Sequence, residues 1–87
     1  MNISAVAIDP RVADVSVTEE ALIVTLRDGR QIRAPLNWFP RLAAASPAAR
    51  MVWEPAGAGH GIHWPEIDED LSVEGLLKGF QAPDRRN

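Results

Sequence analysis

The residues best suited to chemistry are crowded between Gly57 and Leu77, a stretch that holds both histidines, a tryptophan and a run of acids. Imidazole and carboxylate are the side-chain groups left to bind a metal or move a proton when cysteine is absent. His63 paired with Glu66 or Asp68 is therefore one candidate centre. It would serve a small-ligand sensor or a metal-assisted hydrolase.

The spacing of the two histidines argues against one shared ion. His60 and His63 lie three positions apart in the sequence, and residues an odd number of positions apart in one extended strand point to opposite faces. A histidine oriented by a single carboxylate is more often structural than catalytic. We therefore expect no catalytic residue, no metal and no cofactor in this stretch.

The acids have two other roles available. They precede Ser72, a residue type that caps helix N-termini, where the helix dipole favours negative charge. Exposed carboxylates also attract a basic protein partner and pair with its arginines. The predicted partner-binding surface consists of His63, Trp64, Glu66, Asp68, Glu69 and Asp70.

Nucleophilic catalysis finds little support in the chain. There is no cysteine, and no serine lies in a Gly-x-Ser-x-Gly elbow. Gly57, Gly59 and Gly61 lead into a strand, whereas phosphate binding uses glycines that lead into a helix N-terminus. In a strand, glycines at every second position leave one face bare. We expect a protein without enzymatic activity.

Length and charge narrow the class of protein. A chain of 87 residues forms one small core, because a domain of this size buries only about 60% of its unfolded surface. The net charge of −3 opposes a sequence-independent grip on nucleic acid. No stretch approaches the roughly 20 apolar residues of a spanning helix, and the start lacks the basic region of a signal peptide. We expect a cytoplasmic protein that is not attached to a membrane.

Alternating polarity predicts a three-stranded meander. Its strands run over residues 13–17, 22–26 and 32–36, and a second, loosely connected hairpin joins residues 51–54 to 61–64. The side chains expected to face the core are Ala13, Val15, Val17, Leu22, Val24, Leu26, Ile32, Ala34 and Leu36.

The register of the first hairpin follows from its side chains. A two-residue turn at Asp28-Gly29 would pair apolar Leu26 with polar Gln31, whereas a three-residue loop pairs Val24 with Ile32. We therefore predict the three-residue loop. Gly29 then takes the left-handed conformation, which glycine adopts without a Cβ clash.

Prolines and serines mark the helices. Short helices are predicted from Pro40 and from Pro47, the second with a serine N-cap, and a last helix begins at Ser72 and stops at Gly79. The apolar stripe expected on that last helix is Val73, Leu76, Leu77 and Phe80. The residues expected to act structurally are Gly29, Trp38, Phe39, Pro40, Leu42 and Pro65.

The pattern as a whole indicates an α+β fold, in which the meander and the second hairpin pack with two or three short helices. We expect residues 1–80 to form a single domain and residues 81–87 to form a mobile tail.

Two motifs point to a known family. They are the sequence WFPRL at residues 38–42 and the sequence GIHWP at residues 61–65, accompanied by DGR at 28–30, the acids at 68–70 and VEGLL at 73–77. Over residues 12–79 the chain closely resembles the bacterial family called domain of unknown function 2442. The resemblance implies a compact α+β fold like the N-terminal domain of a small family of proposed regulators, some of which carry a helix-turn-helix region after it. With no room for that region after Phe80, direct DNA binding is not expected.

The resemblance also implies a partner. Genes of this family commonly lie beside genes of domain of unknown function 4160, and the pair has been suggested to be a toxin-antitoxin system. The leading hypothesis is therefore a non-enzymatic protein-binding module, antitoxin-like, that docks a small protein. The sensor or hydrolase built on His63 remains an alternative, and so does a homo-oligomer formed through a sheet edge or exposed tryptophans.

Overall fold

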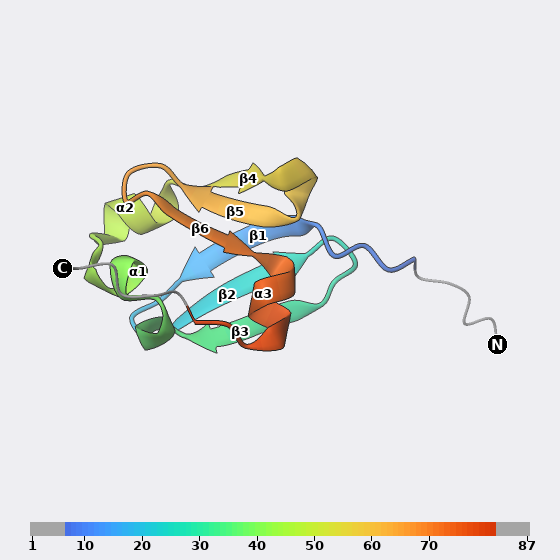
Figure 1. Ribbon diagram of the computed structural model, residues 1–87, viewed down its shortest axis with the longest axis horizontal. Coiled ribbons are helices and arrows are strands. Elements are labelled where there is room, and N and C mark those ends of the chain that lie inside the picture. Colours follow the sequence, from blue (N-terminus) through green and yellow to red (C-terminus); the bar gives the residue numbers. More distant parts are fainter. Residues whose placement is uncertain (1–6, 82–87) are drawn as a thin grey trace.

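The described part of the chain folds into two antiparallel sheets and three short α-helices, so the expected α+β class is confirmed (Figure 1). The computed structural model describes residues 7–81, so the predicted tail lies outside the described residues from 82 onward. The strands are β1 Val12–Val17, β2 Ala21–Leu26 and β3 Gln31–Pro35 in the first sheet, and β4 Glu54–Ala56, β5 Gly61–Trp64 and β6 Glu69–Ser72 in the second. The α-helices are α1 Pro40–Ala44, α2 Pro47–Met51 and α3 Val73–Lys78, and 3₁₀ turns occupy Leu36–Trp38 and Gly57–Gly59.

The first hairpin has the predicted register. Val24 lies opposite Ile32 and Leu22 lies opposite Ala34, while the amide of Gly29 donates to the carbonyl oxygen of Leu26 at 3.0 Å. Gly29 has a φ of +95°. The three-residue loop with a left-handed glycine is therefore confirmed.

Strand β1 differs from the prediction at its start. The pairing with β2 shifts between Val12 and Asp14, and this bulge turns Ala13 outward while Val12 takes the buried position. Strict alternation fails here because a bulge adds one residue to a strand without a partner opposite it.

The helix starts are confirmed. Pro40 and Pro47 occupy first-turn positions of α1 and α2, and the Ser46 hydroxyl accepts from the amide of Ala49 at 3.1 Å. Ser72 caps α3 in the same way, by accepting from Gly75 at 2.9 Å. These caps satisfy amides that have no partner inside the helix.

The expected stripe of α3 is only half buried. Val73 and Leu76 face the core, whereas Leu77 and Phe80 are 56% and 64% exposed. The helix has six residues, fewer than two turns, and ends where Gly79 adopts a φ of +81°. Phe80 therefore lies beyond the helix and off its buried face.

The second sheet has one strand more than expected. The predicted strand at 51–54 begins later, at Glu54, because α2 continues to Met51. Residues 69–72, expected to be solvated acids ahead of a helix, form β6 and pair with β5. Periodicity missed this strand because its most buried inward side chain is Glu69, only 3% exposed.

The core lies between the inner faces of the two sheets. Trp64, Phe39, Leu42 and Ile62 are fully buried in one cluster with the side chains of β2, and Trp38 is partly buried against that cluster. The expected role of Trp38, Phe39 and Leu42 in covering the sheet is therefore confirmed.

One buried arginine joins several elements at the edge of this core. Arg50 is 8% exposed and donates from Nε to the carbonyl oxygen of Leu42 at 2.9 Å and from Nη2 to that of Ala43 at 2.9 Å. Its Nη1 donates to Glu19 Oε1 at 3.1 Å. Its own carbonyl oxygen accepts from the Trp64 indole Nε1 at 3.1 Å.

The segment before β1 is tied to the first hairpin. The amide of Asp9 donates to Asp28 Oδ2 at 3.0 Å, and the amide of Arg27 donates to the carbonyl oxygen of Arg11 at 2.8 Å. Arg11 also donates from Nε and Nη2 to the Asp9 carboxylate, each at 2.9 Å. These hydrogen bonds from the Arg11 side chain lower the pKa of Asp9 from its ordinary value of 3.8 to about 2.

Replacing Gly29 tests the hairpin. We expect Gly29→Val to lower the free energy of unfolding by about 1–2 kcal/mol, because a β-branched residue is strained at positive φ. Gly29→Asn is the matched control, since asparagine tolerates this conformation. A Cβ at this position would meet nothing within 4 Å, so the difference in urea unfolding between the two variants reports backbone strain. If Gly29→Val unfolded like the parent, the register argument would be wrong.

The ion pair between Asp9 and Arg11 makes the stability of the fold depend on pH. Because the pKa of Asp9 is lowered in the folded state to about 2, the carboxylate stabilises the fold above roughly pH 4, and this contribution is lost as pH falls towards 2. A carbon-13 titration of the Asp9 carboxyl should show a midpoint near 2, and Arg11→Gln should return it towards 3.8. A parent midpoint already at the ordinary value would contradict the pairing.

Candidate functional site

The second sheet has two faces of different character. Across β5 and β6, Ile62 pairs with Leu71 and Trp64 pairs with Glu69, and these side chains turn towards the core. The intervening residues turn outward, because successive side chains in a strand alternate between faces. We call this the outer face of the second sheet; it consists of Glu54, Ala56, Gly61, His63, Asp70 and Ser72.

A row of polar side chains crosses the outer face. Glu54 lies opposite His63 on one side, and Asp70 lies opposite it on the other. His63 Nδ1 lies 2.8 Å from Asp70 Oδ1, and the Asp70 side chain is 67% exposed. The histidine is therefore oriented by a carboxylate that solvent also reaches.

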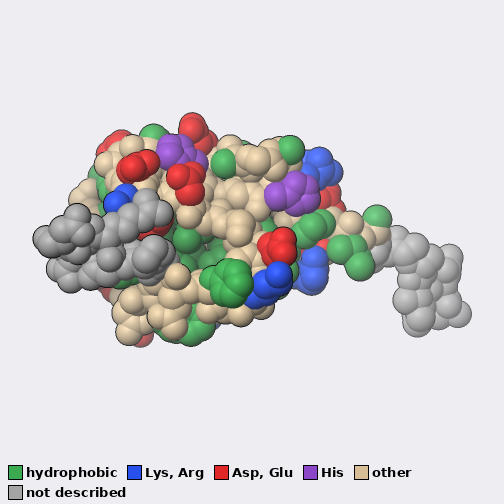
Figure 2. Space-filling model, in the orientation of Figure 1, with side chains coloured by type: hydrophobic (Ala, Val, Ile, Leu, Met, Phe, Trp, Pro, Cys, Tyr) green, Lys and Arg blue, Asp and Glu red, His purple; other side chains and the backbone are tan. Residues whose placement is uncertain are grey.

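This contact corrects the expected partner of His63. Glu66 and Asp68 lie in the turn between β5 and β6, whereas the pairing of the two strands places Asp70 directly opposite the histidine. His60 precedes β5 and is exposed. The two histidines stand well apart on the surface (Figure 2).

Metal coordination gains no support from the described part of the chain. Within residues 7–81, no three His, Cys, Asp or Glu side chains are grouped in a way that would hold an ion. The His63–Asp70 pair supplies two such groups, and a structural zinc site needs four protein ligands.

Two residues of the predicted partner-binding surface are buried. Trp64 is fully buried and Glu69 is 3% exposed, because β6 forms and both side chains face inward from a paired position. Glu69 Oε1 accepts from the amide of Asp70 at 3.2 Å. His63, Glu66, Asp68 and Asp70 remain accessible, and their binding role stays a prediction.

The turn at residues 65–68 is held from α1. Arg41 Nη1 donates to the carbonyl oxygen of Asp68 at 2.7 Å, while the Asp68 side chain is 82% exposed. Asp68 has a φ of +50°. The arginine thus fixes the main chain of the turn and leaves the carboxylate facing solvent.

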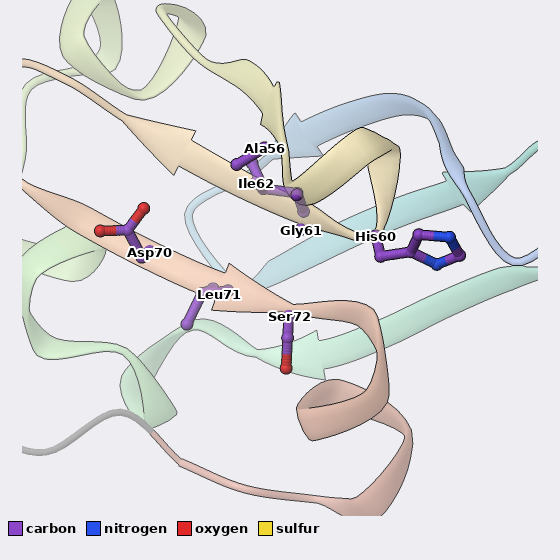
Figure 3. A pocket seen from close by; sticks show the side chains of 8 residues that line it. Ala56, His60, Gly61, Ile62, Asp70, Leu71 and Ser72 are labelled. Carbon is purple, nitrogen blue, oxygen red and sulfur yellow. The ribbon is translucent and has the colours of Figure 1, made fainter.

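A shallow groove of about 470 Å³ runs along the outer face beside this polar row. Its lining comes from β4, β5, β6 and the 3₁₀ turn, as Figure 3 shows. The residues are Ala56, Gly57, His60, Gly61, Ile62, Asp70, Leu71 and Ser72. The lining therefore combines small and apolar residues with one carboxylate.

Gly61 explains the floor of the groove. A Cβ there would lie 3.1 Å from the carbonyl oxygen of Leu71, so the close approach of β6 favours glycine. Gly57 and Gly59 instead have φ values of +59° and +93° and serve the turn. The glycine spacing in the sequence thus signalled a bare strand face correctly at Gly61, whereas Glu54 and the groove itself were not predicted.

A match to a protein-family model shows which family the chain belongs to. The model described as Protein of unknown function (DUF2442) matches residues 12–82. The chain belongs to the DUF2442 family. The resemblance seen in the WFPRL and GIHWP motifs is therefore confirmed.

Solved structures share the DUF2442 chain's fold. A protein of unknown function from Rhodospirillum rubrum, solved by crystallography, is 30% identical with a TM-score of 0.70, covering 85% of this chain and 92% of that one. An uncharacterized protein from Chromobacterium violaceum, solved by solution NMR, is 21% identical with a TM-score of 0.72, covering 86% of this chain and 71% of that one; at that identity it shows the fold alone. No curated protein matches the chain.

Two further observations bear on the earlier expectations for this DUF2442 chain. None of the helices within residues 7–81 is long and apolar enough to span a membrane. Trp64 is buried, whereas Trp38 and Trp53 are half-buried, so association through tryptophans stays a prediction that could involve only these two. Association through a sheet edge stays a prediction.

Proposed function

We propose that this DUF2442 chain is a non-enzymatic module that docks a small basic protein on the outer face of its second sheet. One observation carries the proposal. The stretch from Met51 to Leu77 contains six acids and no lysine or arginine, and the rest of the chain holds the other six acids and all nine bases.

The fold turns most of this charge towards solvent. Glu54 and Asp70 flank His63 on the outer face, and Glu66 and Asp68 extend the acidic surface along the adjoining turn. Figure 2 shows acidic side chains gathered around one histidine over this part of the molecule. The exposed carboxylates of the second sheet and of the turn at residues 65–68 form what we call the acidic surface: Glu54, Glu66, Asp68 and Asp70.

Arginines near the acidic surface do little to neutralise it. Arg41 gives its short hydrogen bond to a main-chain oxygen and lies 3.9 Å from the Asp68 carboxylate. Arg50 is buried and directed towards α1 and Glu19. The acidic surface therefore keeps a negative potential, which speeds encounter with a positively charged partner and weakens as salt increases.

The chemistry of the site favours binding over catalysis. His63 and Asp70 form an oriented pair, yet they stand on an open strand surface beside a shallow groove. A small toxin-like protein, the partner that the family resemblance implies, is the first candidate. This chain would then act as its antitoxin-like counterpart.

Charge removal on the acidic surface tests the proposal. The double variant Asp68→Asn/Asp70→Asn should bind the co-expressed product of the neighbouring gene with an association rate about tenfold lower at low salt, because rim charges act mainly on encounter. Asparagine keeps the shape at both positions and tolerates the positive φ of residue 68. Stopped-flow fluorescence measures the rate.

The matched control is Asp14→Asn/Glu20→Gln, which removes the same charge from exposed positions of the first sheet. Its association rate should stay within about twofold of the parent rate. Two separate gel-filtration peaks for the parent pair at micromolar concentration would contradict the docking proposal. An equal loss of rate in both double variants would contradict its placement on the second sheet.

A further inference from the structure

The groove on the outer face offers one charged group on an otherwise neutral surface. Its lining includes the small residues Gly61 and Ala56, and Asp70 is the acidic residue among the lining residues. Figure 3 shows Asp70 and His60 towards opposite ends of the labelled set. The groove thus combines a smooth apolar bed with a single anion.

We propose that this groove receives an arginine side chain of the docked basic protein; this inference rests on the proposed function. The aliphatic part of the side chain lies over Gly61 and Ala56, and the guanidinium pairs with Asp70. Long cationic side chains bind in this divided manner, with the stem on apolar surface and the charged head at a polar group.

The Asp70 carboxylate has capacity for this pairing. Its Oδ1 contacts His63 Nδ1 at 2.8 Å, and its side chain is 67% exposed. An ionised carboxylate offers about four lone-pair positions, so a guanidinium binds from the solvent side while the histidine contact persists. His63 then acts as a positioning residue, because it holds the carboxylate at the side of the groove.

The negative charge of Asp70 favours a cationic side chain in the groove over anionic or wholly apolar ligands. An anion such as phosphate meets Asp70 and no lysine or arginine in the lining. A wholly apolar side chain would leave that carboxylate without a partner as water is displaced, which costs free energy. Arginine is favoured over lysine because its planar fork pairs with both oxygens of a carboxylate and is less strongly hydrated than an ammonium group.

The bed of the groove is built into the sheet. A Cβ at Gly61 would lie 3.1 Å from the Leu71 carbonyl oxygen, which is a tight contact, and 3.6 Å from the Ala56 carbonyl oxygen, which is an ordinary one. The close approach of β6 therefore favours a residue without a side chain at this position. An extended side chain then finds a flat surface between Ala56 and Ser72.

A small-molecule titration tests the inference without the partner. Nα-acetyl-arginine amide added to the nitrogen-15-labelled chain should shift the amide signals of Gly61, Ala56 and Asp70 with saturation in the millimolar range. The neutral analogue Nα-acetyl-citrulline amide has nearly the same shape and should bind about tenfold more weakly, because only a charged group gains the strong pairing.

Three variants sharpen the result. Asp70→Asn should reduce the response to arginine amide to that of citrulline amide, and Ala56→Leu should weaken both by filling the bed. Asp14→Asn, a carboxylate removed from the first sheet, should change neither. Equal binding of the two probes, or arginine shifts that survive Asp70→Asn, would overturn the groove assignment.

Different results would contradict the docking function and the groove assignment. A partner that co-purifies with the chain and binds Asp70→Asn and Ala56→Leu like the parent would leave the docking function standing and overturn the groove. Saturable, Asp70-dependent binding of arginine amide together with no co-purifying partner would retain the groove and contradict the proposed function.

Discussion

One buried residue, Arg50, links α1, the first sheet and the second sheet at the edge of their shared core. Its guanidinium donates hydrogen bonds to carbonyl oxygens at the end of α1 and to Glu19 in the turn of the first sheet. Its main-chain carbonyl oxygen accepts a hydrogen bond from the Trp64 indole of β5. Each buried polar group left without such a partner would cost about 1–3 kcal/mol. The ion pair with Glu19 contributes less, since that carboxylate is 84% exposed. The hydrogen bonds to the helix carbonyls and from the indole are therefore the stronger of the polar contacts that Arg50 makes.

The two faces of the second sheet differ, because one packs on the core and the other faces solvent. Trp64 and Ile62 are fixed inward by packing, so alternation forces His63 and Asp70 outward. The surface that we propose for a partner thus lies on the same strands that close the core. Rigid strands suit this role, because a preorganised site loses less conformational entropy on binding than a loop does.

Sequence reasoning succeeded where local chemistry decides the structure and failed where pairing decides it. The loop at Gly29, the cap at Ser46 and the stop at Gly79 depend on a few neighbouring residues, and all were predicted. The bulge that exposes Ala13 and the strand that buries Glu69 depend on partners distant in sequence. The position of Asp70 was missed for the same reason. Asp70 reaches His63 only through the pairing of β5 with β6, and residue spacing within a single helix or strand does not predict such pairing.

In the proposed function, the outer face of the second sheet contacts the partner and the first sheet does not. Cross-saturation NMR on the labelled chain in complex with the product of the neighbouring gene tests it most directly. The account predicts saturation transfer to amides of β4, β5, β6 and the turn at residues 65–68, with little at β1, β2 and β3. Transfer concentrated on the first sheet, with the second sheet silent, would contradict it.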